Sequence, residues 1–347
     1  MTGPTMTSRE RVLCAMRCEQ PDMVPWIEEV VDRRAVYPLM GKRPESIVDG
    51  VHDVRTAEEE KEISTFLGRD NITFNAIAPE FCDKTLGADG VYYYGRGHIR
   101  TEADLGLLQL PDPARDGTFQ AAERFLAQKG DFAACAVSRL GLASTYLSLG
   151  MQNFFTQVIE NPPFVLAVLK KYTEWAKAVL PRLCRMGFDF LWICDDIAYK
   201  TGPMISPAMY RNLFLPHLKE VAEAITIPWL CHSDGNLLPL MEDWLRLGQS
   251  AINPIEPQAM DIRHVKAVYG RRVCIVGNID VDLLAQGTPA QVAAAVKACI
   301  RDLAPPAGIS WPAATPFRPT PNPKMCRPWR MRSNNTGTIH NPSQRRA

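Results

Sequence analysis

Acidic and imidazole side chains stand directly after two successive apolar runs in the second half of the chain. Asp195 and Asp196 follow the first run, and His232 and Asp234 follow the second. Two adjacent carboxylates can hold a cation, orient a substrate or serve as acid and base. A histidine with an aspartate two residues further on can ligate a metal or act as a general base. Each motif alone also occurs where a strand simply meets a loop, so their shared position is the stronger signal.

The next two apolar runs end in the same way. Glu256 follows residues 251–255, and Asp280 follows residues 273–277. Helix capping would explain any one of these acids, but it explains four consecutive runs less well. The sequence therefore predicts that the acids after all four runs converge with His232 on one cleft.

The elements that must position these residues alternate between strands and helices. Unalternated apolar runs, which are typical of strands buried on both faces, occur at residues 24–27, 72–77, 133–138, 188–194, 227–231, 251–255 and 273–277. Between the later runs, Asn161-Pro162, Ser206-Pro207 and Thr288-Pro289 each join an N-cap residue to a proline suited to the first helical position. Gly187 is placed to end the first of these helices. Alternation of this length predicts an α/β fold, either a doubly wound sheet or a (β/α)8 barrel.

Seven candidate strands without a break in composition favour a single (β/α)8 TIM barrel. An eighth strand is due just after Ala307-Gly308, where the pattern fails, so we expect the last βα unit to be disrupted. In such a barrel the chemistry lies at the C-terminal ends of the strands, where the acids and His232 stand. Earlier in the chain, residues 92–94 read as a half-buried strand, and Gly95-Arg96-Gly97-His98 reads as a polar turn.

Composition restricts the class of protein. The 347 residues are 46% hydrophobic and 22% charged, which excludes a disordered chain or a small disulfide scaffold. No apolar stretch approaches the ~18 residues of a membrane span, and the N-terminal residues lack an apolar signal core, so we expect a cytoplasmic protein without a membrane partner. Ten cysteines without a Cys-x-x-Cys pair are expected to be reduced. The net charge of −6 over residues 1–302 argues against nucleic acid as a partner.

Taken together, the motifs resemble those of the uroporphyrinogen decarboxylase superfamily over about residues 8–308. The resemblance rests on six motifs in the order of that family, which are Arg9-Glu10-Arg11-Val12, Pro21-Asp22-x-Val24-Pro25, Asp195-Asp196, Gly202-Pro203-Met204-Ile205-Ser206-Pro207 with Tyr210-Arg211, His232-Ser233-Asp234-Gly235 and Gly277-Asn278-Ile279-Asp280. It implies one barrel with its site at the C-terminal mouth. The family includes porphyrinogen decarboxylases that need no cofactor and zinc-dependent methyltransferases that work with corrinoid proteins.

The sequence departs from the decarboxylase branch after the first strand. Family decarboxylases carry arginines there that offset a substrate with many carboxylates, whereas this chain has Glu28, Glu29 and Asp32. The Phe-Ser-Asp motif expected after the second strand reads Phe74-Asn75-Ala76. Repulsion between like charges in a poorly solvated cleft costs several kcal/mol, so uroporphyrinogen itself is disfavoured as the substrate.

The methyltransferase branch has a His-x-Cys-Gly motif after the fifth strand that supplies two zinc ligands. His232 falls on that histidine, and Asp234 replaces the cysteine. A harder site of His232, Asp234 and Glu256 could hold zinc and act as a Lewis acid on a small methoxy or thiol substrate. We therefore expect a zinc-dependent methyltransferase that works with a corrinoid protein. A porphyrinogen decarboxylase and a catalytically inactive barrel are the alternatives. The remaining expected roles are catalytic for Asp195, Asp196 and Asp280, and substrate-binding for Tyr199, Asn236 and Asn278.

The C-terminal segment differs in composition from the rest of the chain. No acid follows Asp302, and seven prolines lie between Pro312 and Pro342. We expect a barrel domain at residues 1–308 and an aberrant basic, proline-rich tail at residues 309–347. A one-nucleotide shift of frame permits an ending close to the Ser-Ser-Asn-Ser-Ile-Pro and Pro-Glu-Asn-Val segments of the family. Sequencing the gene around codon 309 tests this hypothesis, which is wrong if no frame continues into such an ending.

Overall fold

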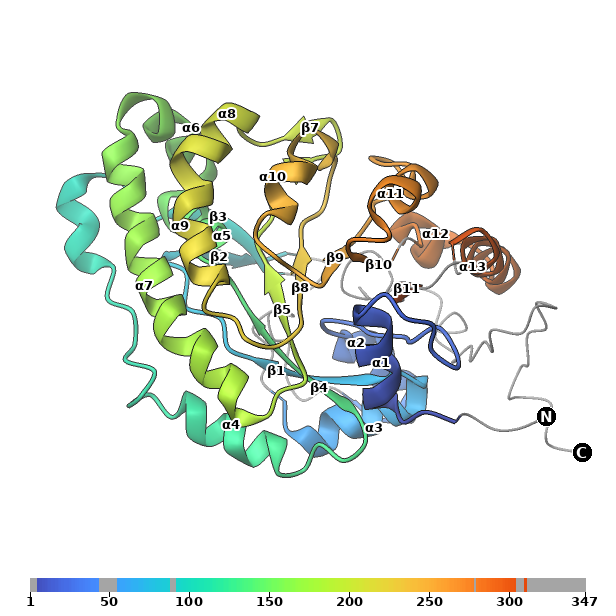
Figure 1. Ribbon diagram of the computed structural model, residues 1–347. Coiled ribbons are helices and arrows are strands. Elements are labelled where there is room, and N and C mark those ends of the chain that lie inside the picture. Colours follow the sequence, from blue (N-terminus) through green and yellow to red (C-terminus); the bar gives the residue numbers. More distant parts are fainter. Residues whose placement is uncertain (1–4, 44–54, 88–91, 278, 304–308, 311–347) are drawn as a thin grey trace, which may run out of the picture.

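The apolar runs form one parallel sheet. The computed structural model describes residues 5–43, 55–87, 92–277, 279–303 and 309–310 (Figure 1). Within these residues the sheet has seven parallel strands in the order β1-β4-β5-β8-β9-β10-β11. The strands are β1 (Asn71–Asn75), β4 (Ala133–Ser138), β5 (Phe190–Cys194), β8 (Trp229–His232), β9 (Ala251–Asn253), β10 (Cys274–Val276) and β11 (Ile309–Ser310). Six of the seven predicted strands are confirmed, with ends shifted by up to two residues.

The first predicted strand is the exception. Residues 24–27 contain only an isolated bridge at Trp26, although the segment does lie beside the start of β1. The backbone N–H of Asp70 donates to the Trp26 carbonyl at 2.7 Å, and the Asn71 amide donates to the Glu28 carbonyl at 2.9 Å. Pro25 has no N–H to donate, so a regular ladder cannot run through this segment.

A two-residue strand lies at the position due for the eighth strand, where the sequence pattern fails and we expected disruption. The two residues of β11 pair with β10 in parallel, with Ile309 opposite Ile275. The segment expected to begin the tail thus starts with a strand of the sheet. Residues 311–347, on which the shifted-frame hypothesis bears, lie outside the described residues.

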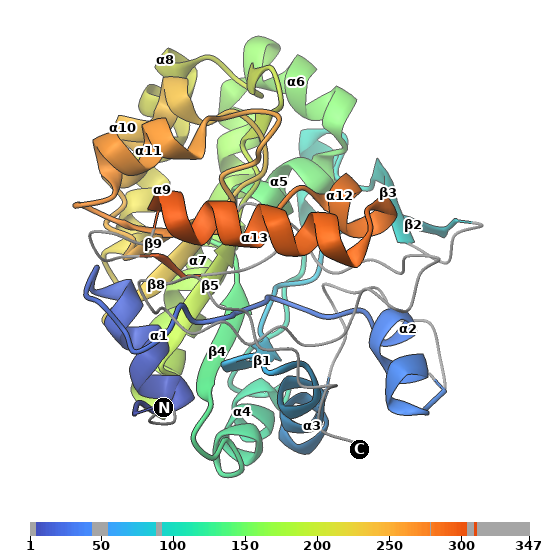
Figure 2. The same ribbon diagram turned by 90° about the vertical axis from the view of Figure 1, so that its right-hand side faces the viewer.

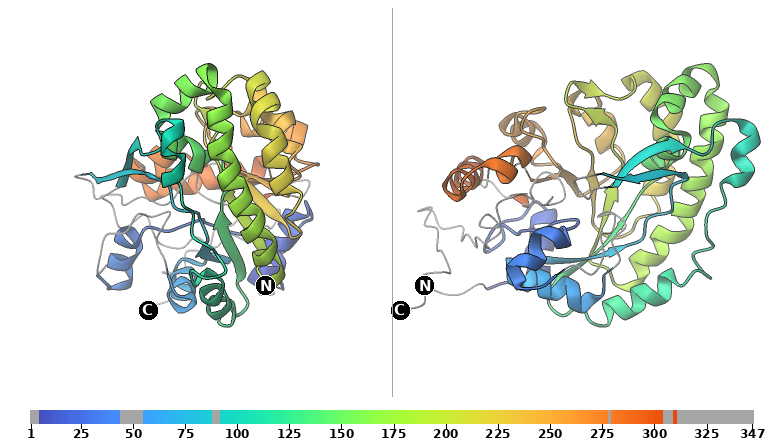
Figure 3. Two further views of the ribbon diagram at one scale, coloured as in Figure 1. Left: turned by 90° about the vertical axis from the view of Figure 1, so that its left-hand side faces the viewer. Right: turned by 180° about the vertical axis from the view of Figure 1, so that it is seen from behind.

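Helices follow the strands and cover the outside of the sheet. They are α1 (Ser8–Met16), α2 (Arg33–Val36), α3 (Ala57–Leu67), α4 (Thr118–Leu126), α5 (Leu142–Leu149), α6 (Met151–Glu160), α7 (Pro162–Met186), α8 (Pro207–Met209), α9 (Leu215–Ala222), α10 (Met241–Leu245), α11 (Ile262–Tyr269), α12 (Val281–Gln286) and α13 (Pro289–Leu303). Figures 1 and 3 show α7 and α9 on one side of the molecule and α11 to α13 on the other, and Figure 2 faces α13. No helix in the described part of the chain is long and apolar enough to cross a membrane.

The predicted helix ends are confirmed at three places. The Asn161 side chain accepts from the Phe164 N–H at the start of α7, and Ser206 accepts from the Met209 N–H at the start of α8. At the other end of α7, Gly187 has φ +108°, in the left-handed region that favours glycine.

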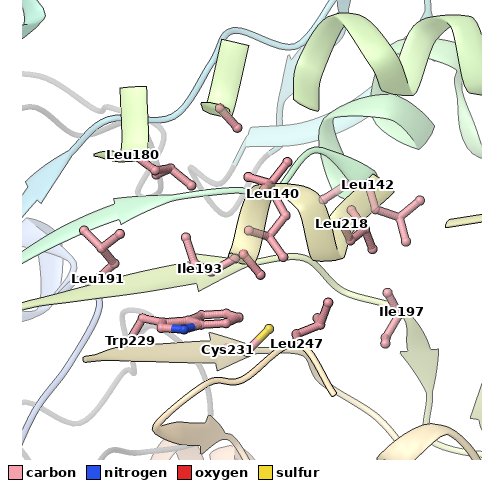
Figure 4. Close-up of a cluster of buried hydrophobic side chains, with 14 of the residues drawn as sticks. Leu140, Leu142, Leu180, Leu191, Ile193, Ile197, Leu218, Trp229, Cys231 and Leu247 are labelled. Atoms are coloured by element: carbon pink, nitrogen blue, oxygen red, sulfur yellow. The ribbon is translucent and has the colours of Figure 1, made fainter. Parts of the chain in front are cut away.

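Alternate residues of each strand pack in two separate apolar clusters. One cluster lies between the strands and the surrounding helices and includes Leu191, Ile193, Trp229 and Cys231 (Figure 4). The other cluster consists of the intervening strand residues and one face of α1. No other helix of the described residues contributes to it, so this cluster fills the interior that the strands enclose. Its members are Val12, Ala15, Met16, Ile27, Ala133, Cys135, Val137, Phe190, Trp192, Cys194, Leu230, Ala251, Cys274 and Val276. Strands that are apolar on both faces explain the unalternated runs in the sequence.

The predicted turn at residues 95–98 is wrong. Residues Tyr92–Gly97 form β3, which pairs antiparallel with β2 (Cys82–Leu86). A Cβ atom added at Gly97 would lie 2.2 Å from the backbone nitrogen of Gly150. Close packing of two backbones therefore explains this glycine, which the sequence pattern attributed to a turn.

Charged motifs near the N-terminus fasten α1 to the sheet. The Arg11 guanidinium donates to Asp22 at 2.7 Å and to Asp70 at 2.6 Å, and Arg9 contacts Asp189 at 2.6 Å. Arg11 and Asp70 are buried, and the chain from Asp22 onward leads directly to the segment beside β1. The Arg-Glu-Arg and Pro-Asp motifs are thus structural.

Replacing Asp22 by asparagine should destabilise the fold in a pH-dependent way. Burial raises the pKa of Asp22, but hydrogen bonds from Arg11 and the Met6 N–H outweigh it and lower this pKa to about 2, from 3.8. The carboxylate therefore contributes up to about 2 kcal/mol above pH 4, and this contribution is lost as the pH falls toward 2. Urea unfolding at pH 6 and pH 3 should show a difference between wild type and Asp22→Asn that shrinks at the lower pH. The exposed Asp112→Asn is the control, and a constant difference would contradict the pairing.

Candidate metal centre at the barrel mouth

Three strands end side by side at the mouth. Cys194, His232 and Asn253 are the last residues of β5, β8 and β9, and each is the register partner of the next. Cys194 belongs to the interior cluster, as does Leu230, two residues before His232. His232 and Asn253 therefore face the interior at its C-terminal end, where barrel enzymes carry their chemistry.

The imidazole of His232 is held in one orientation. Its Nδ1 lies 2.6 Å from Asn253 Oδ1, and the Asn253 amide nitrogen donates to the Val276 carbonyl at 3.3 Å. The second bond turns the amide oxygen toward the ring, so Nδ1–H is the donor. Nε2, on the opposite side of the ring, is then the nitrogen that would bind a metal after losing its proton. Metal-binding histidines are commonly oriented in this way, by donating the other ring N–H to an oxygen.

Two carboxylates lie close to the imidazole. Ligand atoms of Asp196, His232 and Asp234 all lie within 4.8 Å of one another. Nε2 is 3.7 Å from Asp196 Oδ1, which also accepts the Asp234 N–H at 2.9 Å. Two donors ~2.1 Å from one tetrahedral zinc ion stand roughly 3.4 Å apart, so the 3.7 Å between His232 and Asp196 is close to the spacing around a shared ion. One imidazole and two carboxylates are a donor set that zinc accepts, with a fourth position left for a substrate.

The charges of the cluster favour a cation. Burial alone would lower the pKa of His232, but the carboxylates of Asp196, Asp234 and Glu29 raise it to about 9. Burial raises the pKa of Asp234 to about 6, with Asp196 and Glu256 adding repulsion and His232 opposing the rise. A divalent ion would replace the imidazole proton and neutralise the acids together.

Replacing Asn253 by alanine should weaken cation binding by about 10- to 100-fold, because the ring of His232 would lose the acceptor that fixes its tautomer. Competition with a chromophoric chelator would measure the affinity for Zn²⁺. Asn253→Asp, which keeps an acceptor oxygen, should retain most of the affinity. An Asn253→Ala variant that binds Zn²⁺ as tightly as the wild type would show that this orientation is unimportant.

Asp195 lies apart from the cluster. Its carboxylate accepts the N–H groups of Leu140 and Ala143 at 2.7 Å and that of Gly141 at 3.3 Å, just before and within the first turn of α5. Burial raises the pKa of Asp195 to about 6, although these hydrogen bonds oppose the rise. The geometry is that of a buried helix cap, so the catalytic role predicted for Asp195 has no support from its position.

The remaining rim residues form a polar chain beside the cluster. Lys200 Nζ lies 3.4 Å from Glu256 Oε1 and 2.9 Å from Gln258 Oε1, and the Gln258 amide donates to Asp280 at 3.0 Å. Glu256 also accepts the Gly235 N–H at 3.0 Å. Glu256 is thus adjacent to the cluster, whereas Asp280 caps α12 through the N–H groups of residues 282 and 283.

Two of the predicted substrate-binding residues lie at the same rim, and the third lies outside the residues that the structure describes. Tyr199 is 48% exposed, and its carbonyl accepts the Asn236 N–H at 2.8 Å. The Asn236 side chain accepts the Leu238 N–H, which shapes the loop after β8. Asn278 lies outside the described residues.

Two residues of the site were not assigned roles from the sequence. Asn253 precedes a proline at the end of its strand, a position at which a loop boundary is the ordinary reading. Glu29 follows the irregular first segment, and its buried carboxylate raises the pKa of His232. A polar residue two positions after interior-facing Ile27 is the signal that could have identified Glu29.

Comparisons with known proteins agree with this architecture. The curated "Methylated-thiol--coenzyme M methyltransferase" of Methanosarcina mazei is 27% identical over 155 residues, a match that covers 44% of this chain and 40% of that protein. A solved structure, the methyltransferase from Methanosarcina mazei, superposes with a TM-score of 0.76 at 16% identity and covers 93% of this chain and 96% of its own. The family described as Uroporphyrinogen decarboxylase (URO-D) matches residues 91–310, which include β4 to β11 and the whole Asp196–His232–Asp234 cluster. The chain belongs to the uroporphyrinogen decarboxylase family.

Proposed function

We propose that this protein is a zinc-dependent methyltransferase that works with a corrinoid protein on a small methylated substrate, a methoxy compound or a thiol. The observation that carries the proposal is the orientation of His232, whose Nδ1 is held by Asn253 while Nε2 lies 3.7 Å from Asp196, in a cluster that also holds Asp234. The relatives that are methyltransferases support the reaction type. The zinc, the corrinoid partner and the substrate class are parts of the proposal.

The residues of the mouth would have separate roles. Asp196, His232 and Asp234 would hold the ion, and Asn253 fixes the tautomer of His232. Bound zinc would act as a Lewis acid that favours the deprotonated form of a thiol or hydroxyl. Burial of His232 among apolar strand residues keeps bulk water from its ring and strengthens every charge interaction there. Glu256, next to the loop that carries Asp234, is placed to contact the substrate or the ion after a small movement.

A porphyrinogen decarboxylase fits the same mouth less well. Four carboxylates, those of Asp196 and Asp234 in the cluster and of Glu29 and Glu256 beside it, would repel a substrate with many carboxylates. Arg139, at the end of β4, forms an ion pair with Glu80, and its charge is therefore already matched. A decarboxylase needs cations where this chain has acids.

Metal analysis of the purified full-length protein, followed by methyl-transfer assays, tests the proposal. We expect close to one Zn²⁺ per chain, and zinc-dependent transfer of a methyl group either from methylcobalamin to a small thiol or from a methoxy compound to cob(I)alamin. Release of CO₂ from uroporphyrinogen, independent of metal, would instead establish the decarboxylase. Binding of either ligand without turnover would indicate an inactive barrel.

A further inference from the structure

A carboxylate from the first segment of the barrel lies inside the mouth. Ile27 packs in the interior cluster, and Glu29, two residues on, is 7% exposed. The backbone between them is anchored to β1, because the Glu28 N–H donates to the Asn71 side chain at 3.0 Å and the Asn71 amide donates back to the Glu28 carbonyl. These bonds fix the direction in which the next side chain leaves the backbone.

The carboxylate of Glu29 is only partly satisfied. Among the residues that the structure describes, its Oε1 is buried without a hydrogen-bond partner. A hydrogen bond joins the Cys194 thiol and the Glu29 carboxylate, so the side chain of Glu29 reaches the end of β5. A buried carboxylate oxygen without a partner costs several kcal/mol, and such groups in folded proteins call for a specific explanation.

The neighbours of Glu29 supply that explanation. Cys194 is the register partner of His232, so Glu29 lies against the same layer of side chains as the imidazole. With Asp196 and Asp234, Glu29 brings three acids to one imidazole, which leaves a net negative charge that a divalent cation would balance.

We propose that Glu29 is a further member of the cation site, to which it adds negative charge and an acceptor oxygen. The inference rests on the proposed function, because it takes the ion to be held by Asp196, His232 and Asp234. Glu29 lies outside that compact group of three, so it would act beside the ligands, where its Oε1 can accept a hydrogen bond from a water or a substrate heteroatom. Three carboxylates and one imidazole form a harder set than the thiolate site of zinc methyltransferases.

Titration of the full-length protein with Zn²⁺ in competition with a chelator, and with Co²⁺ followed by visible absorption, tests this role. Glu29→Gln should weaken binding of both ions by about 10- to 100-fold and alter the Co²⁺ spectrum. Glu29→Asp, which keeps the charge, should lose less. Glu28→Gln is the matched control, because Glu28 accepts from the Trp26 indole at 2.7 Å and glutamine preserves that acceptor. Melting curves of all the variants would establish that they fold.

The outcomes separate the two proposals. If His232→Ala abolishes binding while folded Glu29→Gln binds as the wild type does, the cation site stands and the role of Glu29 is wrong. If neither change affects binding, the proposed metal centre itself is wrong. If Glu29→Gln does not fold, the affinity of Glu29→Asp decides, and wild-type affinity together with an unchanged Co²⁺ spectrum overturns the inference.

Discussion

Replacing His232 by alanine should abolish cation binding and, with it, methyl transfer. The imidazole is the one nitrogen donor in the cluster of the described residues, and it is the donor whose orientation a second residue fixes. Without it, two carboxylates whose charges repel each other would have to hold the ion alone. We expect the affinity for Zn²⁺ to fall by more than about 100-fold, beyond the loss expected from altering an outer-shell partner.

The fold should survive this change. The variant leaves Asn253 Oδ1 without its donor, which costs roughly 1–3 kcal/mol, but it also removes a source of buried charge. Zinc stoichiometry measured on protein of unchanged circular dichroism would separate loss of the site from loss of the fold. His264→Ala is the control, because His264 is exposed on α11. A His232→Ala protein that retains a full equivalent of zinc would refute the metal role of His232.

The sheet was predictable because its strands are apolar on both faces. Residues such as 133–138 and 188–194 stand out as uninterrupted apolar runs, and the helices between them begin at residues with strong capping preferences. The first segment was predicted less well, since Pro25 interrupts its ladder and its pairing with β1 depends on the side chain of Asn71. That contact joins residues 43 positions apart, and a local pattern cannot reveal it.

The site was only partly predictable for a related reason. The sequence correctly places Asp196, His232 and Asp234 near one another, because the ends of neighbouring parallel strands meet at one edge of a sheet. It could not separate Asp195 from Asp196, which are adjacent in the chain but whose carboxylates make different contacts. Nor could the sequence assign a role to Glu29, because its contact with Cys194 joins residues far apart in the chain.

Replacing Asp195 by alanine should destabilise the whole barrel, unlike the same change at Asp196. The Asp195 carboxylate accepts three backbone N–H groups at the start of α5, and those groups are buried with it. Truncation would leave the three donors without a partner, at a cost of about 3 kcal/mol or more. Asp195→Asn should cost less, because its remaining oxygen can still accept from either Leu140 or Ala143.

Urea unfolding monitored by tryptophan fluorescence would measure the loss, and Trp192 on β5 is a suitable probe. The same proteins should bind Zn²⁺ with nearly wild-type affinity at temperatures where they are folded, because Asp195 contributes no ligand atom to the cluster. Asp196→Ala should show the reverse, with weak cation binding and a small change in stability, since that side chain is 41% exposed. If Asp195→Ala instead left stability unchanged and removed methyl transfer, Asp195 would be catalytic, and the capping geometry would not explain why the chain carries an acid at this position.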